Sequence, residues 1–379
     1  MKLGEIFEGR VRGVSSDGLG VVEAPDRRVF FAPATWTGDV GRFQVVELKR
    51  RHGIAKLVEM IEASPSRVVP PCPHHGWGEK NCGGCVWQFA SYEAQLVAKQ
   101  DRVEQALRRA RLDVSAKPIL PSPKIYGYRN RAQLKTDGDR IGFVELGARR
   151  IAEVEDCLVL SESNRKHLRS LRSELPRRDW KPRPPHPWNF IDIDEDFSNA
   201  ELVLNKRRPF RQANTEQNVV MREWLALRIS ALPKEWHVLE LFAGSGNFTE
   251  IVCAHGFAAI CAAEVVDEAL VALRAKNLEG VTPVAADLFQ DAAYARIKSV
   301  FPRAELLVLD PPRDGLKDKA GLLATYPELR AIASISCDVA TFTRDLTDFI
   351  AAGFKVVELQ PLDQFPHTPH IEIMAWLER

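Results

Sequence analysis

Short apolar runs separated by turn residues mark the first part of the chain. Val21-Val22 and Val29-Phe30-Phe31 are rich in β-prone residues, and Asp17-Gly18 is a typical hairpin sequence. The stretch Ile54–Val58 continues the pattern with alternating faces. This pattern predicts a small β-barrel of the OB type over residues 1–62.

The middle of the chain mixes helical and strand-like patterns. Apolar residues recur at helical spacing within residues 91–111. Residues 125–205 contain three strand-like segments: Gln133–Lys135, Ile141–Phe143 and Leu202–Leu204. The proline-rich stretch 176–187 is predicted to be an exposed loop. We therefore expect an α+β domain over residues 63–207.

From about residue 216, helical segments alternate with wholly apolar runs. The strands predicted from these runs are Val238–Leu241, Ala258–Ala262, Leu306–Leu309 and Ala331–Ile335. Such alternation is typical of a doubly wound parallel α/β sheet of the Rossmann type. We assign this domain to residues 208–379, and the length of 379 residues agrees with a multi-domain protein.

The first of these strands runs into a glycine turn. Gly244 and Gly246 allow a tight turn and a close approach of the backbone to a ligand, and the helix start offers free N–H groups. Glu264 ends the next predicted strand, where an acidic residue binds ribose hydroxyls. Asp287 is a candidate partner for an adenine amino group. Because the third glycine of a dinucleotide site is missing, the pattern favours S-adenosylmethionine.

Two further strand ends carry candidate chemistry. Asp310-Pro311-Pro312 follows one strand, at the edge of the sheet where ligands bind. Enzymes that methylate amino groups carry an aromatic residue after a similar motif, whereas Arg313 stands here. Cys337 ends the following strand, where it is either a small packing residue or a nucleophile.

The tail of the chain contains His367, His370 and Glu372, which suit a surface loop, acid–base groups or a metal site. A second set of candidate ligands is formed by four cysteines: Cys72, Cys82, Cys85 and Cys157. Four thiolates suit zinc or a 4Fe–4S cluster, and their spacing alone slightly favours zinc.

Several of these motifs, in this order, resemble the RNA 5-methyluridine (uracil-C5) methyltransferase family along nearly the whole chain. They are Phe210-Arg211-Gln212, the glycine turn, Asp310–Arg313, Ser336-Cys337 and the terminal segment Phe365–Glu372. The chain departs from the family at Asp338-Val339, where Asn-Pro is usual. That departure puts the rigidity of the loop and its contacts to uracil in question.

The resemblance implies a function for each part. Cys337 would be the covalent nucleophile that adds to C6 of uracil, and Glu372 the base that removes the C5 proton. The residues expected to line the cofactor and uracil pocket are Gln212, Phe242, Gly244, Gly246, Asn247, Glu264, Asp287 and Asp310.

The resemblance also reverses the preference for zinc. Many members carry a 4Fe–4S cluster on Cys-x5-Cys-Gly-Gly-Cys plus a distant cysteine, and here the first spacer is four residues longer. The N-terminal barrel resembles a TRAM domain, in which Phe30, Phe31 and Trp36 are candidate stacking platforms for RNA bases. Members with this arrangement imply large-subunit ribosomal RNA as the substrate, with transfer RNA as the alternative.

The charge changes this picture little. The formal net charge is only +1, but basic residues gather before residue 210, in Lys49–Arg51, Arg108–Arg111, Arg149-Arg150, Arg177–Arg183 and Lys206–Arg208. We expect a cytoplasmic protein without a membrane segment and without an obligate protein partner. Two rival interpretations are an enzyme that methylates nitrogen, which would not need Cys337, and an RNA chaperone that has lost the chemistry.

Overall fold

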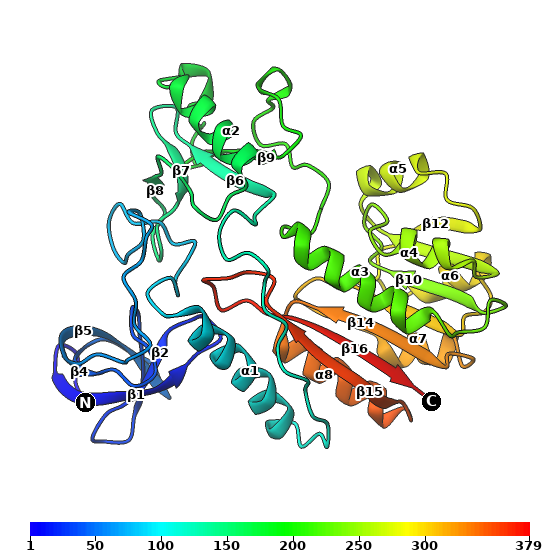
Figure 1. Cartoon of the computed structure of the whole chain (residues 1–379), viewed down its shortest axis with the longest axis horizontal. Helices are drawn as coiled ribbons and strands as arrows, with labels where there is room; N and C mark the ends of the chain where they lie inside the picture. The colour runs from blue at the N-terminus through cyan, green and yellow to red at the C-terminus, as the bar shows by residue number, and fades with distance from the viewer. The chain divides into compact units, whose positions relative to one another are not determined.

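The computed structural model describes residues 1–379, apart from the side chain of Glu201. The chain divides into two compact units. The N-terminal unit comprises Met1–Lys99, Lys124–Arg208 and Phe365–Pro369, and the C-terminal unit comprises Gln100–Pro123, Pro209–Gln364 and His370–Arg379. Figure 1 shows the elements of both. No helix among the described residues is long and apolar enough to cross a membrane.

The N-terminal unit begins with a closed five-stranded barrel, which fits the predicted OB type. Its strands are β1 (Ile6–Val14), β2 (Gly20–Glu23), β3 (Val29–Ala32), β4 (Val40–Leu48) and β5 (His52–Glu62), in the order β1-β2-β3-β5-β4. Phe7 lies at the centre of the barrel core, with ring centroids 5.1 Å from Phe30 and 5.7 Å from Phe43. Three packed aromatic rings thus fill the small interior.

This packing corrects one expectation about RNA binding. Phe30 is fully buried in the barrel core, and Trp36 is buried against Trp87 at 5.1 Å. Neither ring can stack on a base, because burial removes its faces from solvent. Phe31 is only partly buried and packs edge-on against His52.

A second sheet of the N-terminal unit has the antiparallel order β8-β7-β6-β9. Its strands are β6 (Arg131–Thr136), β7 (Ile141–Val144), β8 (Ile151–Glu153) and β9 (Asn189–Asp194), and α2 (Glu162–Ser173) packs on it. The predicted strand at Leu202–Leu204 is wrong. These residues follow the short 3-10 helix η2 (Asn199–Glu201), and Leu202 and Leu204 pack onto the sheet from a turn. The proline-rich stretch 176–187 is irregular except for the 3-10 helix η1 (Arg178–Trp180).

The predicted helix at 91–111 is α1 (Tyr92–Arg109). Val103 and Leu107, in its second half, belong to the core of the C-terminal unit. That unit is built on a seven-stranded sheet with the order β12-β11-β10-β13-β14-β16-β15. The strands are β10 (His237–Leu241), β11 (Ala259–Glu264), β12 (Val281–Ala285), β13 (Leu306–Leu309), β14 (Ala331–Ser336), β15 (Lys355–Leu362) and β16 (Glu372–Glu378).

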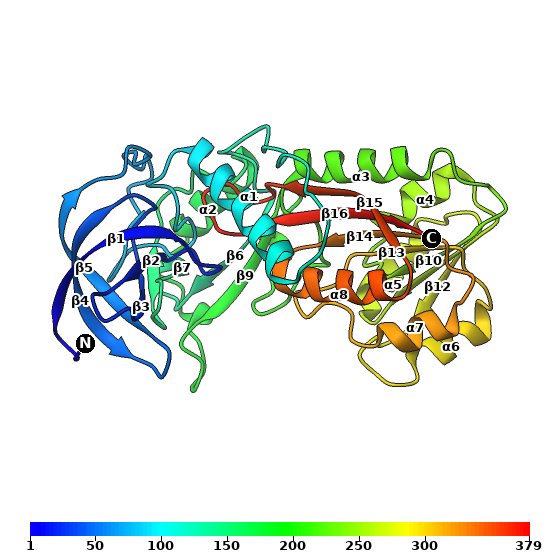
Figure 2. The same ribbon diagram turned by 90° about the horizontal axis from the view of Figure 1, so that it is seen from below.

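Helices cover both faces of this sheet. They are α3 (Thr215–Ile229), α4 (Thr249–His255), α5 (Asp267–Ala275), α6 (Ala293–Val300), α7 (Lys319–Thr325) and α8 (Val339–Ala351). Figure 2 shows α3 and α4 on one side, with α6, α7 and α8 on the other. Each side buries its own apolar core, as expected for a doubly wound fold.

The sheet departs from the prediction at one edge. The first five strands in the order are parallel, but β16 runs antiparallel to both β14 and β15. Glu372 therefore begins a buried strand, whereas His367 and His370 lie in the non-strand segment between β15 and β16, where His367 is buried and His370 half-buried. In the pairing of β14 with β16, Ser336 is opposite Ile373. Continuing this register by one residue brings Cys337 level with Glu372.

Candidate active site

A cavity of about 470 Å³ opens in the C-terminal unit, near the carboxyl ends of β10, β11, β13 and β14. This volume lies in the usual range for a small-molecule site. Eight of the ten residues predicted as catalytic or cofactor-binding line it: Gln212, Phe242, Gly244, Glu264, Asp287, Asp310, Cys337 and Glu372. Residues from distant parts of the chain thus meet at one edge of the sheet, where ligands bind in such folds.

One end of the cavity suits a nucleoside. The Glu264 carboxylate accepts hydrogen bonds from the backbone N–H of Gly244 at 2.8 Å and of Val266 at 2.9 Å. These bonds fix the acid beside the glycine turn, where it can meet ribose hydroxyls. Asp287 accepts a hydrogen bond from the backbone N–H of Phe289, which lowers the pKa of Asp287 and keeps it an acceptor.

Apolar residues form the walls at this end. Val265, Val266, Ala286, Leu288 and Phe289 all line the cavity, and sequence reasoning did not select them. The only signal for them was their position next to the two predicted acids. Phe242 has a φ of 62°, a left-handed conformation that a bulky residue seldom adopts and that concentrates at functional sites.

Gly246 and Asn247 lie in the same turn but do not line the cavity. Gly246 has a φ of 89°, which favours glycine, and a Cβ there would also come within 2.6 Å of Leu273 Cδ1. The Asn247 side chain exchanges two hydrogen bonds of 2.9 Å with Asn218 and also accepts one from Arg222. Gly246 and Asn247 therefore support the conformation of the glycine turn without lining the cavity.

The other end of the cavity holds the predicted catalytic residues Cys337 and Glu372, together with Asp310. Cys337 follows β14, Glu372 begins β16, and Asp310 follows β13. Gln212 donates a hydrogen bond from Nε2 to Asp310 Oδ2 at 3.2 Å, and its Oε1 accepts one from Gln364 at 3.1 Å. The side chain of Gln212 is therefore held in place through both its amide nitrogen and its amide oxygen.

Burial shifts the ionisation of all three groups, and repulsion from nearby carboxylates adds to it for Cys337 and Glu372. Burial raises the pKa of Cys337 to about 12, with further increases from the nearby Glu372 and Asp310. Burial also raises the pKa of Asp310 to about 7, and it raises the pKa of Glu372 well above its usual range. Opposing these effects, Arg313 lowers the pKa values of both Cys337 and Glu372.

Arg313 is thus a functional candidate that sequence reasoning did not place in the site. It lines the cavity, and its Nη2 lies 3.4 Å from Nδ1 of His370. Its position directly after Asp-Pro-Pro was the available signal. His367, by contrast, lies in the N-terminal unit, where its ring stacks on Tyr126 at 4.7 Å and its backbone N–H donates to Gln95 Oε1 at 2.7 Å.

The departure at Asp338-Val339 has a structural explanation. Asp338 is the N-cap of α8, and its Oδ1 accepts hydrogen bonds from the backbone N–H groups of Ala340 at 3.0 Å and Thr341 at 2.9 Å. Aspartate and asparagine are about equally good N-caps. The helix therefore begins at Val339, capped by Asp338, without the usual Asn-Pro.

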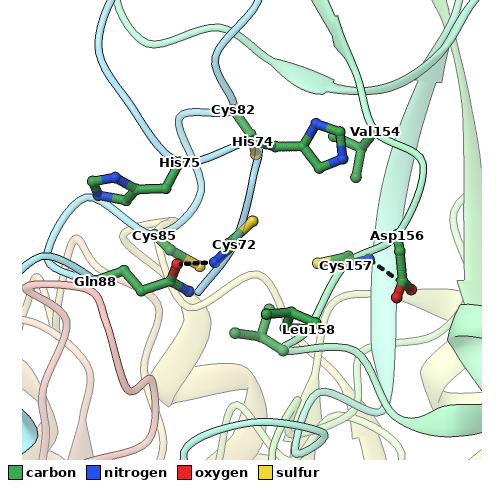
Figure 3. A pocket seen from close by; sticks show the side chains of 11 residues that line it. Cys72, His74, His75, Cys82, Cys85, Gln88, Val154, Asp156, Cys157 and Leu158 are labelled. Carbon is green, nitrogen blue, oxygen red and sulfur yellow. Dashed lines mark hydrogen bonds between the residues drawn. The ribbon is translucent and has the colours of Figure 1, made fainter. Parts of the chain in front are cut away.

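The four predicted metal-ligating cysteines all line a second, much smaller hollow in the N-terminal unit. Figure 3 shows their sulfur atoms facing the same space, while the Asp156 carboxylate points away from it. Burial raises the pKa of each thiol. Nevertheless, no three His, Cys, Asp or Glu residues in the described part of the chain form a group that could hold one metal ion.

A Rossmann-like sheet with a glycine turn, a following acid at a strand end and a cavity lined by both is the arrangement expected of an S-adenosylmethionine-dependent methyltransferase. Within this class, the model of the tRNA (Uracil-5-)-methyltransferase family matches residues 192–379. The chain is 41% identical to an uncharacterized RNA methyltransferase of Nitrosomonas europaea, covering 97% of this chain and 96% of that one.

It is also 30% identical to the 23S rRNA (uracil(1939)-C(5))-methyltransferase of Halomonas elongata, covering 97% of this chain and 88% of that protein. The chain therefore belongs to the family of S-adenosylmethionine-dependent RNA uracil-C5 methyltransferases. The fold agrees with this family. The tRNA (uracil-54, C5)-methyltransferase of Pyrococcus abyssi, solved with S-adenosyl-L-homocysteine, superposes with a TM-score of 0.71 at 20% identity, covering 98% of this chain and 100% of that one.

Proposed function

We propose that this protein methylates C5 of a specific uridine in structured RNA, with large-subunit ribosomal RNA as the substrate, through a covalent bond between Cys337 and C6. The observation that carries the proposal is the meeting of Cys337 and Glu372 in the cofactor cavity, from strands that pair side by side. A nucleophile and a base are the two groups that substitution at uracil C5 requires.

The chemistry follows from the weak nucleophilicity of uracil C5. The Cys337 thiolate forms a bond to C6, and the electron pair of the C5=C6 double bond makes C5 an enolate carbon. S-adenosylmethionine, when bound, supplies the electrophilic methyl group that C5 takes. Glu372, as a carboxylate, then removes the C5 proton, the double bond re-forms, and the Cys337 thiolate leaves.

The charges around Cys337 suit this cycle. In the free site, burial favours the protonated forms of Cys337, Glu372 and Asp310, and repulsion from nearby carboxylates adds to this for Cys337 and Glu372. Arg313 is the charged group facing them that favours a thiolate. During the reaction, negative charge is carried in turn by Cys337, the uracil ring and Glu372. We infer that Arg313 stabilises this charge at each stage.

The rival that methylates nitrogen gains no support from the site. That chemistry uses an aromatic residue after Asp-Pro-Pro and needs no thiol, whereas Arg313 and Cys337 both line this cavity. The chaperone rival rested on Asp338-Val339, and Asp338 still caps the helix that follows the nucleophile. We therefore retain the enzymatic proposal.

RNA that contains 5-fluorouridine tests the covalent mechanism. Fluorine in place of the C5 hydrogen cannot be removed by Glu372, so the enzyme should remain bonded to the methylated RNA as a complex that survives denaturation. Mass spectrometry of rRNA and tRNA from a deletion strain identifies the substrate. Loss of 5-methyluridine from tRNA instead of 23S rRNA would favour the transfer-RNA alternative.

We further propose that Cys72, Cys82, Cys85 and Cys157 hold a 4Fe–4S cluster. The donor set suits it, because four thiols face one hollow whose other walls include Val154, Leu158 and Val159. A cubane binds each thiolate on a different iron, so it accepts sulfurs spaced more widely than one zinc ion does. Its role would be to support the RNA-binding part of the chain.

This proposal accompanies a division into three domains. Residues 1–62 would be the TRAM-like barrel, residues 63–207 the domain that carries the cluster, and residues 208–379 the methyltransferase domain. A target base must leave its stack at a cost of a few kcal/mol before it enters the cavity. Contacts of large-subunit rRNA with the first two domains would offset this cost.

The cluster leads to a prediction about metal content. Protein purified without oxygen should be brown and carry about four irons per chain. Cys85→Ser should lose most of this iron, because it removes one of the four thiolates. Cys253→Ser is the matched control, since Cys253 lies in α4 of the C-terminal unit and should keep full iron content. Stoichiometric zinc without iron would contradict the cluster.

A further inference from the structure

Two loops of the active site leave neighbouring strands of the C-terminal sheet. The loop after β13, residues 310–318, carries Asp310 and Arg313 into the cavity and ends at α7. The segment after β14 carries Cys337 and continues directly into α8. Because Arg313 acts on the ionisation of Cys337, the position of one loop relative to the other matters for the chemistry.

A buried carboxylate on α8 holds the loop after β13. Asp345 is 7% exposed, and its Oδ2 accepts a hydrogen bond of 2.8 Å from the backbone N–H of Leu316. Just before Leu316, Gly315 has a φ of 69° and donates its N–H to Pro312 O at 2.8 Å. Asp345 therefore fixes the end of the tight turn that presents Arg313.

A buried lysine completes this anchor. Lys319 is 8% exposed and donates from Nζ to Asp345 Oδ1 at 2.8 Å and to Leu316 O at 2.9 Å. Both backbone groups of Leu316 are thus bonded by side chains of one ion pair. Arg344 extends the anchor by donating from Nη2 to Asp314 O at 2.9 Å.

The anchor leaves little room for the loop to move. A Cβ on Gly315 would lie 2.6 Å from Asp345 Oδ2 and 2.5 Å from Arg344 Nη2, so the turn and α8 are in close contact. Buried ion pairs often add less stability than apolar packing of the same volume. A charged pair in this position is therefore better suited to fixing one geometry than to strengthening the core.

We propose that Asp345, together with Lys319, is a positioning residue that holds Arg313 at the distance from Cys337 and Glu372 that the reaction requires. This inference rests on the proposed roles of Cys337 and Arg313. Asp345 does not line the cavity, so it acts through Arg313 and not on the RNA or the cofactor. The groups that face Cys337 are Glu372 on β16 and Asp310 and Arg313 on the loop.

The test compares two aspartates of the same helix. Asp345→Asn removes the charge that pairs with Lys319 and faces the Leu316 N–H. Asp348→Asn is the control, because Asp348 lies 3.1 Å from the same Lys319, is half-exposed, and makes no side-chain hydrogen bond to the loop in the described structure. Each variant is also made with Arg313→Ala. Single-turnover methyl transfer, affinity for S-adenosylhomocysteine and melting temperature are measured for all of them.

Asp345→Asn should slow methyl transfer on the order of 10²-fold, the cost of a misplaced catalytic group, while affinity for S-adenosylhomocysteine is unchanged. In the Arg313→Ala background, Asp345→Asn should slow methyl transfer little further, because both changes remove the same contribution of the Arg313 side chain. Asp348→Asn should methylate like the parent. If the effects of Asp345→Asn and Arg313→Ala multiply, or if Asp348→Asn is equally slow, the inference is wrong.

A second variant keeps the test decisive if Asp345→Asn does not fold. Arg344→Gln removes a half-exposed side chain that donates to Asp314 O, Leu316 O and Asp345 Oδ1, but it keeps the buried pair of Asp345 and Lys319. It should therefore slow methyl transfer in the same direction but less. Failure of the proposed covalent mechanism has a different signature. In that case the unmodified enzyme would methylate C5 and yet form no stable complex with 5-fluorouridine RNA.

Discussion

Replacing Cys337 with alanine is expected to abolish methyl transfer while leaving the binding of S-adenosylmethionine intact. Without the thiolate, C6 is not attacked, C5 gains no enolate character, and no methyl group can be accepted. The cofactor end of the cavity is formed by other residues, Gly244, Glu264 and Asp287 among them. Methyl transfer from labelled S-adenosylmethionine and calorimetric binding of S-adenosylhomocysteine measure the two properties separately.

Serine at this position should fail nearly as badly. A half-buried hydroxyl beside Glu372 and Asp310 ionises even less readily than the thiol, whose own pKa is already raised to about 12. Cys261→Ala is the matched control, because Cys261 is buried in β11 and should cost only about 0.5–3 kcal/mol of stability. Substantial methylation of uridine C5 by Cys337→Ala would remove the covalent mechanism.

The second large effect is expected from Glu372→Gln, which should trap the enzyme on its methylated product. Glutamine has nearly the same shape but cannot accept the C5 proton, so elimination of Cys337 stalls. The addition step should not be slowed, because the charge of Glu372 raises the pKa of the Cys337 thiol and its removal favours the thiolate. Denaturing gel electrophoresis should show RNA bonded to the variant without any fluorinated base.

Turnover of Glu372→Gln should fall by about 10²–10⁴-fold, the usual contribution of a general base. Turnover of the parent enzyme should rise as the pH rises above 7, because Cys337 and Glu372 must both lose protons and their pKa values are raised. Asp310→Asn removes one nearby acid and leaves these two groups as the source of the pH dependence. Normal turnover by Glu372→Gln would show that another group takes the C5 proton.

Much of the architecture follows from local sequence patterns. The closed barrel and the strands β10, β11, β13 and β14 were predicted, because each apolar run is bounded by turn residues and forms one element. The glycine turn, Glu264 and Asp287 were found for the same reason, since strand ends in a parallel sheet lie at one edge. These local signals need no knowledge of distant partners.

Long-range pairing decided the rest. The sequence did not reveal that β15 and β16 close the sheet in antiparallel fashion, because strand direction depends on which neighbour a segment meets. Only that pairing brings Glu372 level with Cys337. The burial of Phe30 and Trp36 likewise depends on partners far along the chain, so their aromatic character alone suggested RNA stacking.

The residues that position the site show the same limit. Arg313 was visible as part of a motif, whereas nothing near Asp345 or Lys319 in the sequence marks them as an anchor. Their role arises because α8 and the loop after β13 fold against each other and bury both charges. The sequence by itself indicated most of the elements of this methyltransferase and the candidate residues of its site. The tertiary structure decided their mutual geometry, because hydrogen bonds and buried ion pairs form between side chains that only folding brings into contact.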